Sequence, residues 1–238
     1  VKMKKYFIEG LLIFLSVLGA FALESYRLEN SKVELKNNLL IELKNVIEQD
    51  FVQINKVLTI LDETFKSAVI LKNDYFYDKK LKKEDLAIEF SKLRFFNISY
   101  FPQTGVFNQL LSTGSLELIN NQELKRRLIY VYEHMNNRKS AGDFVLDEMS
   151  WRSFKDISDD IYVINSMEEE VDFKASKKFI FSVTPVESFF VSKNYYNSKK
   201  VIQFYSHVST LMKQYKDVIE EIVNEYVEIN KLIESELK

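Results

Sequence analysis

The chain has 238 residues, among them 5 glycines, 2 prolines, 2 histidines and no cysteine, and its formal net charge is −2. Compact all-β and α/β domains use glycine and proline to reverse the chain about every ten residues, so this scarcity excludes them and predicts an all-α fold of long helices. The absence of cysteine excludes disulfides, thiolate zinc sites and cysteine nucleophiles, and the balanced charge gives no basic excess for binding nucleic acid.

An apolar stretch near the start of the sequence, Tyr6–Leu23, contains one charged residue, Glu9. As a helix it would be roughly 27 Å long, close to the hydrocarbon thickness of a bilayer. It follows a basic tail, residues 1–5, so we expect a signal-anchor that stays in the membrane as one transmembrane helix. Two alternatives remain open: a cleaved signal peptide with Ala20–Ala22 as its A-x-A site, or a core helix buried in a soluble protein.

The orientation of this span depends on the basic residues at its two ends. Lysines in residues 1–5 precede it, and Arg27, Lys32 and Lys36 follow it, so the two counts are nearly equal. The lysines before the span form a cluster without acids, whereas those after it alternate with glutamates. We therefore expect the amino terminus in the cytoplasm of a bacterium and residues 24–238 as a helical domain on the outer side of the inner membrane. The side chain of Glu9 is expected either to reach the membrane–water interface or to pair with a partner helix in the membrane.

Two segments without glycine or proline, Glu24–Lys72 and Ser198–Leu237, have apolar residues at helical spacing. In the first segment the seven-residue series is Leu40, Ile47, Ile54, Leu61 and Ala68. The second segment has two series, Tyr205, Met212, Ile219, Tyr226 and Ile233, and Val208, Tyr215, Ile222 and Ile229. Such series indicate coiled-coil-like packing, and we expect the two long helices to pair antiparallel in an elongated bundle.

Shorter elements are expected between the long helices. The lysine-rich stretch Asn73–Lys83 fits a solvated loop or a basic patch for anionic lipid or a partner, and a helix is expected from Asp85 to Phe96. Pro102 and Thr104 indicate a further helix start. Gly114 is expected in the left-handed conformation and Asn121 as a helix cap.

Beyond Asn121 the expected elements are less regular. A turn is expected at Asn136–Gly142 and a helix at Asp143–Ile157. Residues 158–183 should be irregular, with Phe179–Phe181 as one isolated extended piece. The sequence Thr184–Glu187 has the form of a capping box with proline at the first helical position, which predicts a helix start.

The sequence contains no constellation of residues that would carry a reaction. The glycines are too far apart for a phosphate-binding loop or a nucleophile elbow. His134 and His207 belong to no metal-binding pair, and we expect each on a helix face, partly buried. The acidic residues lack EF-hand spacing, and those of residues 220–228 suit a solvated helix face. We therefore expect no catalytic residue, no cofactor, no metal site and no enzymatic activity.

The chain resembles a bacterial family of single-pass membrane proteins classed as a domain of unknown function. The resemblance depends on Glu9 and Tyr26 at the span and on the segment Phe107–Glu133, FNQLLSTGSLELINNQELKRRLIYVYE. The family's run L-x-x-x-G-x-L-x-x-I-x-N-x-x-L maps approximately onto Leu111, Ser115, Leu116, Ile119, Asn121 and Leu124. The family usually has a glycine in the span and a tryptophan after it, where Ser16 and Tyr26 stand here. The resemblance implies no reaction, cofactor or catalytic residue.

These observations predict a membrane-anchored interaction or scaffold protein. Its expected partners are the lipid bilayer and either another protein or a second copy of the chain, with no nucleic acid. The alternative is a membrane-anchored sensory or small-ligand-binding domain, in which the corner at Gly114 shapes a pocket between helices.

Overall fold

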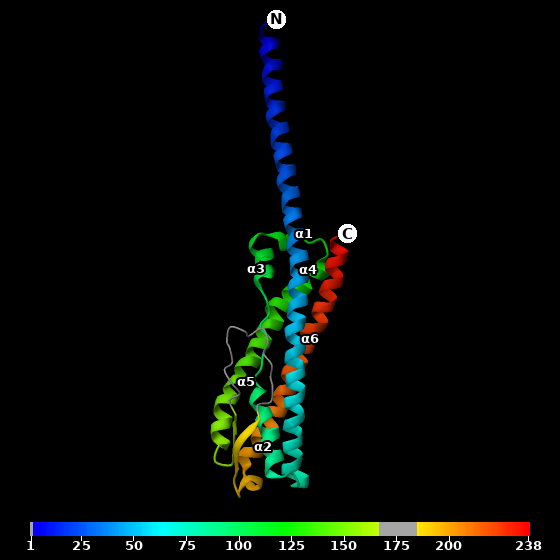
Figure 1. The fold of residues 1–238 in the computed structure, drawn as a ribbon. Coiled ribbons are helices and arrows are strands. Elements are labelled where there is room, and N and C mark those ends of the chain that lie inside the picture. The colour runs from blue at the N-terminus through cyan, green and yellow to red at the C-terminus, as the bar shows by residue number, and fades with distance from the viewer. Residues whose placement is uncertain (1, 167–184) are drawn as a thin grey trace. The chain divides into compact units, whose positions relative to one another are not determined.

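The computed structural model describes residues 2–166 and 185–238 (Figure 1). Its α-helices and strands are α1 (Lys2–Asn73), α2 (Lys83–Lys92), α3 (Gly105–Ser112), α4 (Gln122–Ile129), α5 (Asn136–Ile157), β1 (Ile161–Asn165), β2 (Val186–Val191) and α6 (Lys199–Glu236). Short 3-10 or π turns connect them: η1 (Asp74–Asp78), η2 (Leu93–Phe95), η3 (Ser115–Leu118), η4 (Tyr130–Met135) and η5 (Tyr195–Asn197). Helices dominate the described residues, so the predicted all-α fold class is confirmed.

The chain forms two compact units. Unit 1 consists of residues 1–48, 103–129 and 227–238, and unit 2 consists of residues 49–102 and 130–226. The helices α1 and α6 each contribute a segment to both units.

In unit 1, α1 changes its surroundings at Lys36. Every described side chain from Gly10 to Leu35 is exposed, and this part of α1 extends alone beyond α3 and α4 (Figure 1). From Lys36 onward α1 contributes apolar residues to a core shared with α3, η3, α4 and the end of α6: Leu39, Leu40, Leu43, Ile47, Val106, Phe107, Leu110, Leu116, Leu124, Leu128, Ile229 and Ile233. The ion pairs Lys36–Glu236 and Lys44–Glu234 connect α1 to α6 here.

Unit 2 contains the second half of the α1–α6 pair, with α2, α5 and a two-stranded ribbon. Asp50 contacts Tyr226 and Asp62 contacts Lys216, so the two helices run antiparallel. An aromatic cluster joins α2, the residue directly after η2, α5 and α6, with neighbouring ring centroids 5.3 to 6.4 Å apart: Phe90, Phe96, Phe154 and Phe204.

The seven-residue series of both long helices are buried as predicted. All five members on α1 and all nine on α6 are no more than 3% exposed. The first helix also joins the apolar stretch without a break, since α1 runs from Lys2 to Asn73. An uninterrupted apolar stripe is thus sufficient to predict where these helices run and which face they bury, because burial of apolar surface is the main favourable contribution to the free energy of folding.

The expected helix start at Thr184–Glu187 is wrong where the structure describes it. Val186 begins β2, which pairs antiparallel with β1 in the register Ile161↔Val191 and Val163↔Phe189. β-Branched and aromatic residues suit a half-buried strand, and the pairing with β1 outweighs the local capping signal. Thr184 and Phe179–Phe181 lie outside the described residues.

The expected turn at Asn136–Gly142 is also wrong. These residues lie inside the helix α5, directly after the π turn η4. Gly142 permits a close approach instead: a Cβ atom on it would lie 2.9 Å from Cδ2 of Tyr215. The glycine therefore marks contact with another side chain, not a reversal of the chain.

Candidate functional site

The apolar part of α1 is the first candidate for a functional region, as a membrane-spanning segment. By length and composition, one helix among the described residues is able to cross a membrane, and the most apolar 18 residues of this helix have a mean hydropathy of 1.6. None of these 18 residues is buried within the chain, which argues against the core-helix alternative. The side chain of Glu9 lies outside the described residues.

A buried polar junction occupies unit 1 where α1 becomes covered. The Nζ atom of Lys36 lies 2.8 Å from Oε1 of Glu236, and the two side chains are only 5% and 3% exposed. Glu236 also accepts hydrogen bonds from the backbone N–H groups of Asn120 and Asn121, both at 2.9 Å. One carboxylate therefore joins α1, the end of α6 and the start of α4.

The environment of Glu236 favours its charged form. Burial alone would raise its pKa, but the hydrogen bonds from Lys36 and from the two backbone N–H groups outweigh burial, so the pKa lies below its usual value. The group is thus a structural anion and is not suited to general acid chemistry near neutral pH.

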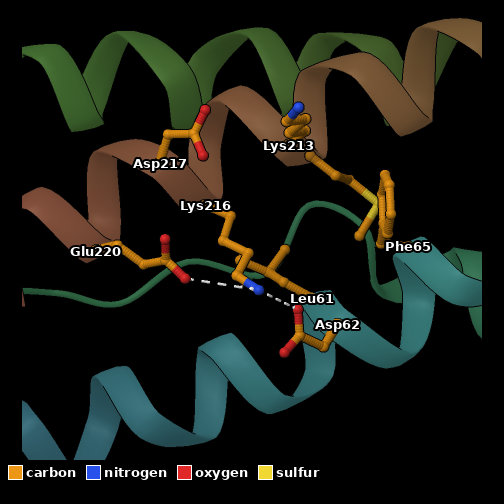
Figure 2. A pocket seen from close by; sticks show the side chains of 8 residues that line it. Leu61, Asp62, Phe65, Lys213, Lys216, Asp217 and Glu220 are labelled. Carbon is orange, nitrogen blue, oxygen red and sulfur yellow. Dashed lines mark hydrogen bonds and ion pairs between the residues drawn. The ribbon is translucent and has the colours of Figure 1, made fainter.

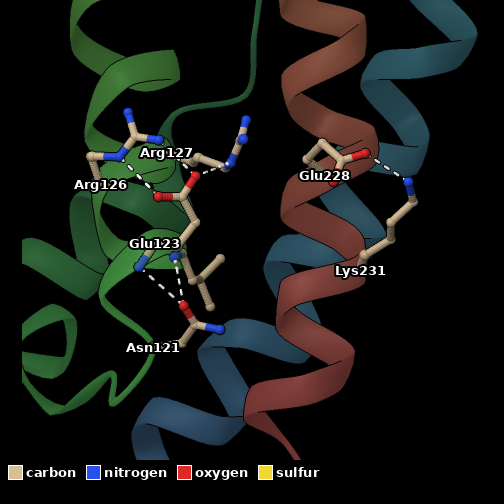
Figure 3. Close-up of polar contacts among 7 residues, drawn as sticks. Asn121, Glu123, Arg126, Arg127, Glu228 and Lys231 are labelled. Carbon is tan, nitrogen blue, oxygen red and sulfur yellow. Dashed lines mark hydrogen bonds and ion pairs between the residues drawn. The ribbon is translucent and has the colours of Figure 1, made fainter.

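The predicted cap at Asn121 is confirmed beside this junction. Its Oδ1 atom accepts hydrogen bonds from the backbone N–H groups of Glu123 and Leu124, at 3.0 and 3.1 Å (Figure 3). The left-handed Gly114, with φ of 71°, precedes η3 as expected. Local side-chain chemistry was therefore sufficient to predict both positions.

The exposed side of unit 1 carries charges that neutralise one another. Glu123 pairs with Arg126 at 2.6 Å and with Arg127 at 2.7 Å, and Glu228 pairs with Lys231 at 2.6 Å (Figure 3). The hydrogen bond from Arg126 is the main reason that the pKa of Glu123 is lowered. Both arginines belong to the segment that carries the family resemblance, but they are engaged with a neighbour on their own helix.

A groove of about 340 Å³ lies between α1 and α6 in unit 2 (Figure 2). Its apolar wall consists of Leu61, Phe65 and Met212. Lys216 lies across it, with Nζ 2.5 Å from Asp62 and 3.6 Å from Glu220. The hydrogen bond to Asp62 raises the pKa of Lys216, whereas a lysine nucleophile requires a lowered pKa.

A second groove of similar volume lies in unit 2 between α2, α5 and β1. Phe90 and Phe154 line it together with Ser91, Ser150 and Arg94. Burial lowers the pKa of Arg94, and its Nη1 atom donates a hydrogen bond of 3.1 Å to Asn165. Gly114, which the sequence suggested as a pocket corner, lines neither groove.

Unit 2 also buries a network of polar side chains. Tyr226 donates a hydrogen bond of 3.0 Å to Asp50, which is fully buried. Lys139 and Tyr215 each donate to Asp143, at 2.5 Å. Burial raises the pKa of Tyr215 and Tyr226 well above the usual value near 10, so these phenols are neutral hydrogen-bond donors.

The buried charges Lys36, Asp50 and Lys139 were not predicted from the sequence. The sequence does contain a pattern that points to Lys36 and Asp50. Both belong to a second seven-residue series of α1, and every member of this series is at most 5% exposed: Lys36, Leu43, Asp50, Val57, Thr64 and Leu71. Polar residues at alternate positions of an apolar series indicate specific buried partners.

The histidines and acidic residues do not cluster into a metal-binding group in the part of the chain that the structure describes. Both His134 and His207 are exposed, in contrast to the expected partial burial. Within residues 2–166 and 185–238, no group of three or more His, Cys, Asp or Glu side chains could hold a metal ion.

A known protein family matches most of this chain. A family of unknown function, DUF6090, matches residues 9–167, which is more than half of the chain. The chain belongs to this family. The DUF6090 match covers α1 from Glu9 through β1 and includes Lys36, Asn120 and Asn121, whereas α6 with Glu236 lies beyond it. The chain matches no curated protein and no solved structure.

Proposed function

We propose that this DUF6090 member is a membrane-anchored helical interaction or scaffold protein that catalyses no reaction. The observation that carries the proposal is α1, which presents an apolar surface from Gly10 to Leu23 that the described chain does not cover, and then continues as a helix into the core of a folded domain. Exposed apolar surface of this extent needs another covering, and a bilayer supplies it.

In this proposal the lipid bilayer is one partner, and Tyr6–Leu23 spans the inner membrane of a bacterium. Residues 24–238 form the domain on the outer side. The near-balance of charge supports a protein partner or a second copy of the chain over nucleic acid.

The partner surface is expected away from the seven-residue series of α6, because those side chains are already buried within the chain. On α5, Phe144 and Trp151 lie seven residues apart and are 67% and 84% exposed. Large aromatic residues contribute disproportionately to protein interfaces, and tryptophan is prominent among them.

A photo-crosslinking amino acid at position 151 tests this proposal in native membranes. We expect a discrete adduct, identified by mass spectrometry, that is lost when Phe144 is changed to alanine. The same amino acid at the exposed position Gln53 should give no adduct. An adduct of two chains means self-association and one with another protein means a scaffold, whereas equal results at 151 and 53 contradict an interaction through this surface.

A ligand-binding domain is the second candidate, and the groove beside Arg94 favours it. Aromatic walls with a few polar groups and one cation suit a small anionic molecule with an apolar body. In a thermal-shift screen of the full chain in detergent, such a molecule should raise the melting temperature, and the Arg94→Gln variant should lose this rise. A screen of anionic metabolites without any stabilising compound would contradict this candidate.

A further inference from the structure

A buried ion pair marks the base of the exposed part of α1. The side chains of α1 are exposed from Gly10 to Leu35, and Lys36 is the first buried one among those that the structure describes. Its ammonium group reaches Glu236 at 2.8 Å. The first buried side chain after the exposed part of α1 is therefore a charge, and the buried apolar residues Leu39 and Leu40 follow it.

Glu236 connects this charge to the start of α4. Its Oε1 atom accepts from Lys36 and from the N–H of Asn120, and its Oε2 atom accepts from the N–H of Asn121. Asn121 in turn caps α4 through its own side chain. The first turn of α4 is thus built on a residue that Glu236 holds in place.

Breaking a buried ion pair is costly because both charges are removed from water. Separating Lys36 from Glu236 leaves the buried ammonium group without its partner and the carboxylate with only the two backbone N–H groups. The carboxylate is then expected to move toward water and to release both N–H groups. We propose that Lys36, Glu236 and the backbone of Asn120 and Asn121 form a latch that couples the position of α1 at its base to the order of the α4 start. The proposal does not depend on a membrane or on a partner.

The chain supplies a matched control on the same two helices. Lys44 and Glu234 also pair at 2.5 Å within unit 1, but their side chains are 33% and 58% exposed. An exposed pair is compensated by water when one partner is removed, so its loss should leave α4 unchanged.

Hydrogen exchange followed by mass spectrometry tests the coupling in the full chain in detergent. In the Lys36→Met variant, exchange of the backbone N–H groups of residues 120–124 should rise about tenfold or more, as expected for loss of a charge-assisted hydrogen bond. The Lys44→Met variant should exchange like the unaltered chain. Unchanged exchange in Lys36→Met, or an equal rise in both variants, would overturn the latch.

A second measurement examines the same coupling from the other end and remains decisive if Lys36→Met does not fold. Coupling is reciprocal, so removal of the cap in Asn121→Ala should expose Lys36 more often. The rate at which an amine-reactive reagent acetylates Lys36, divided by the rate for Lys44, should increase severalfold in this variant. A constant ratio would mean that α4 and α1 move independently, and would also overturn the proposal.

Discussion

Gly142 shows how one residue type serves two different purposes. The sequence predicts a left-handed conformation at Gly114 and a turn that ends at Gly142, and Gly114 has the expected positive φ of 71°. Gly142 instead lies within α5 and leaves room for the ring of Tyr215, whose hydroxyl is fixed on Asp143. Sequence spacing alone does not separate these two uses, because the contact is made by a residue far away along the chain.

In the Gly142→Ala variant the added methyl group should cost about 1–3 kcal/mol, because a buried ring held by a hydrogen bond yields little space. The gain of about 1 kcal/mol from replacing glycine by alanine within a helix offsets part of this cost, so we expect a net destabilisation of up to about 2 kcal/mol. Urea unfolding followed by circular dichroism measures the change in the free energy of unfolding. Gly105→Ala is the control: nothing lies within 4 Å of its added Cβ, so it should be neutral or stabilising. Equal effects of the two substitutions would contradict the packing argument.

The buried tyrosines of unit 2 set an upper pH limit for the stability of the folded chain. Burial raises the pKa of several phenols above the usual value: Tyr100, Tyr132, Tyr195, Tyr205, Tyr215 and Tyr226. In the unfolded chain these groups lose their protons near pH 10, whereas the folded chain retains them. Their contribution to stability is therefore fully present below about pH 10 and is lost as the pH rises toward the folded values.

For the full chain in detergent, we expect the urea concentration at the midpoint of unfolding to stay constant from pH 8 to about pH 9.5 and to fall steeply above about pH 10. Tyrosinate absorbance near 295 nm should rise in two stages, first for exposed tyrosines and then together with the loss of helical circular dichroism. A single titration near pH 10 without unfolding would show that these phenols are accessible to solvent.

At the scale of elements, the polar members of the buried α1 series fix its register. Lys36 contacts Glu236 in unit 1, and in unit 2 Asp50 contacts Tyr226 while Thr64 contacts the carbonyl of Lys92 at 3.4 Å. Apolar side chains tolerate sliding by one turn, but a displaced buried charge would lose its partner. The polar residues thus select one register among several that the apolar stripes would accept.

The Tyr226→Phe variant tests this role. It removes the hydroxyl that donates to the buried Asp50, so we expect a loss of about 1–3 kcal/mol in the free energy of unfolding. Tyr130→Phe is the matched control, because Tyr130 donates to Glu221 at the half-exposed surface, where water replaces it. A Tyr226→Phe effect no larger than that of Tyr130→Phe would mean that Asp50 does not fix the register.

At the scale of the whole molecule, the central prediction is the membrane anchor. The chain has no cysteine, so single cysteines introduced at Lys4 and Gln53 report the two sides of the span without background. In spheroplasts with an intact inner membrane, a membrane-impermeant maleimide should label Gln53→Cys. The same reagent should label Lys4→Cys only after the spheroplasts are lysed. The reverse pattern would place the domain in the cytoplasm, and extraction of the chain by alkaline carbonate would contradict a spanning helix.

The sequence alone determined the all-α class, the two long helices, their buried seven-residue series, the Asn121 cap and the left-handed Gly114. These features depend on periodicity or on side chains within a few residues, and such information is local. It also predicted membership of a family of unknown function.

Only the tertiary structure decided that Val186 begins a strand, that Gly142 lies inside α5, and that Lys36 and Asp50 are buried beside Glu236 and Tyr226. Each of these outcomes depends on a partner far away in sequence. Strand pairing supplies ladder hydrogen bonds that outweigh a local cap, and a buried charge is tolerated only where folding brings its counterpart. The physical reason is the same in each case: a local pattern states what a residue prefers, whereas the surrounding fold decides which preference is satisfied.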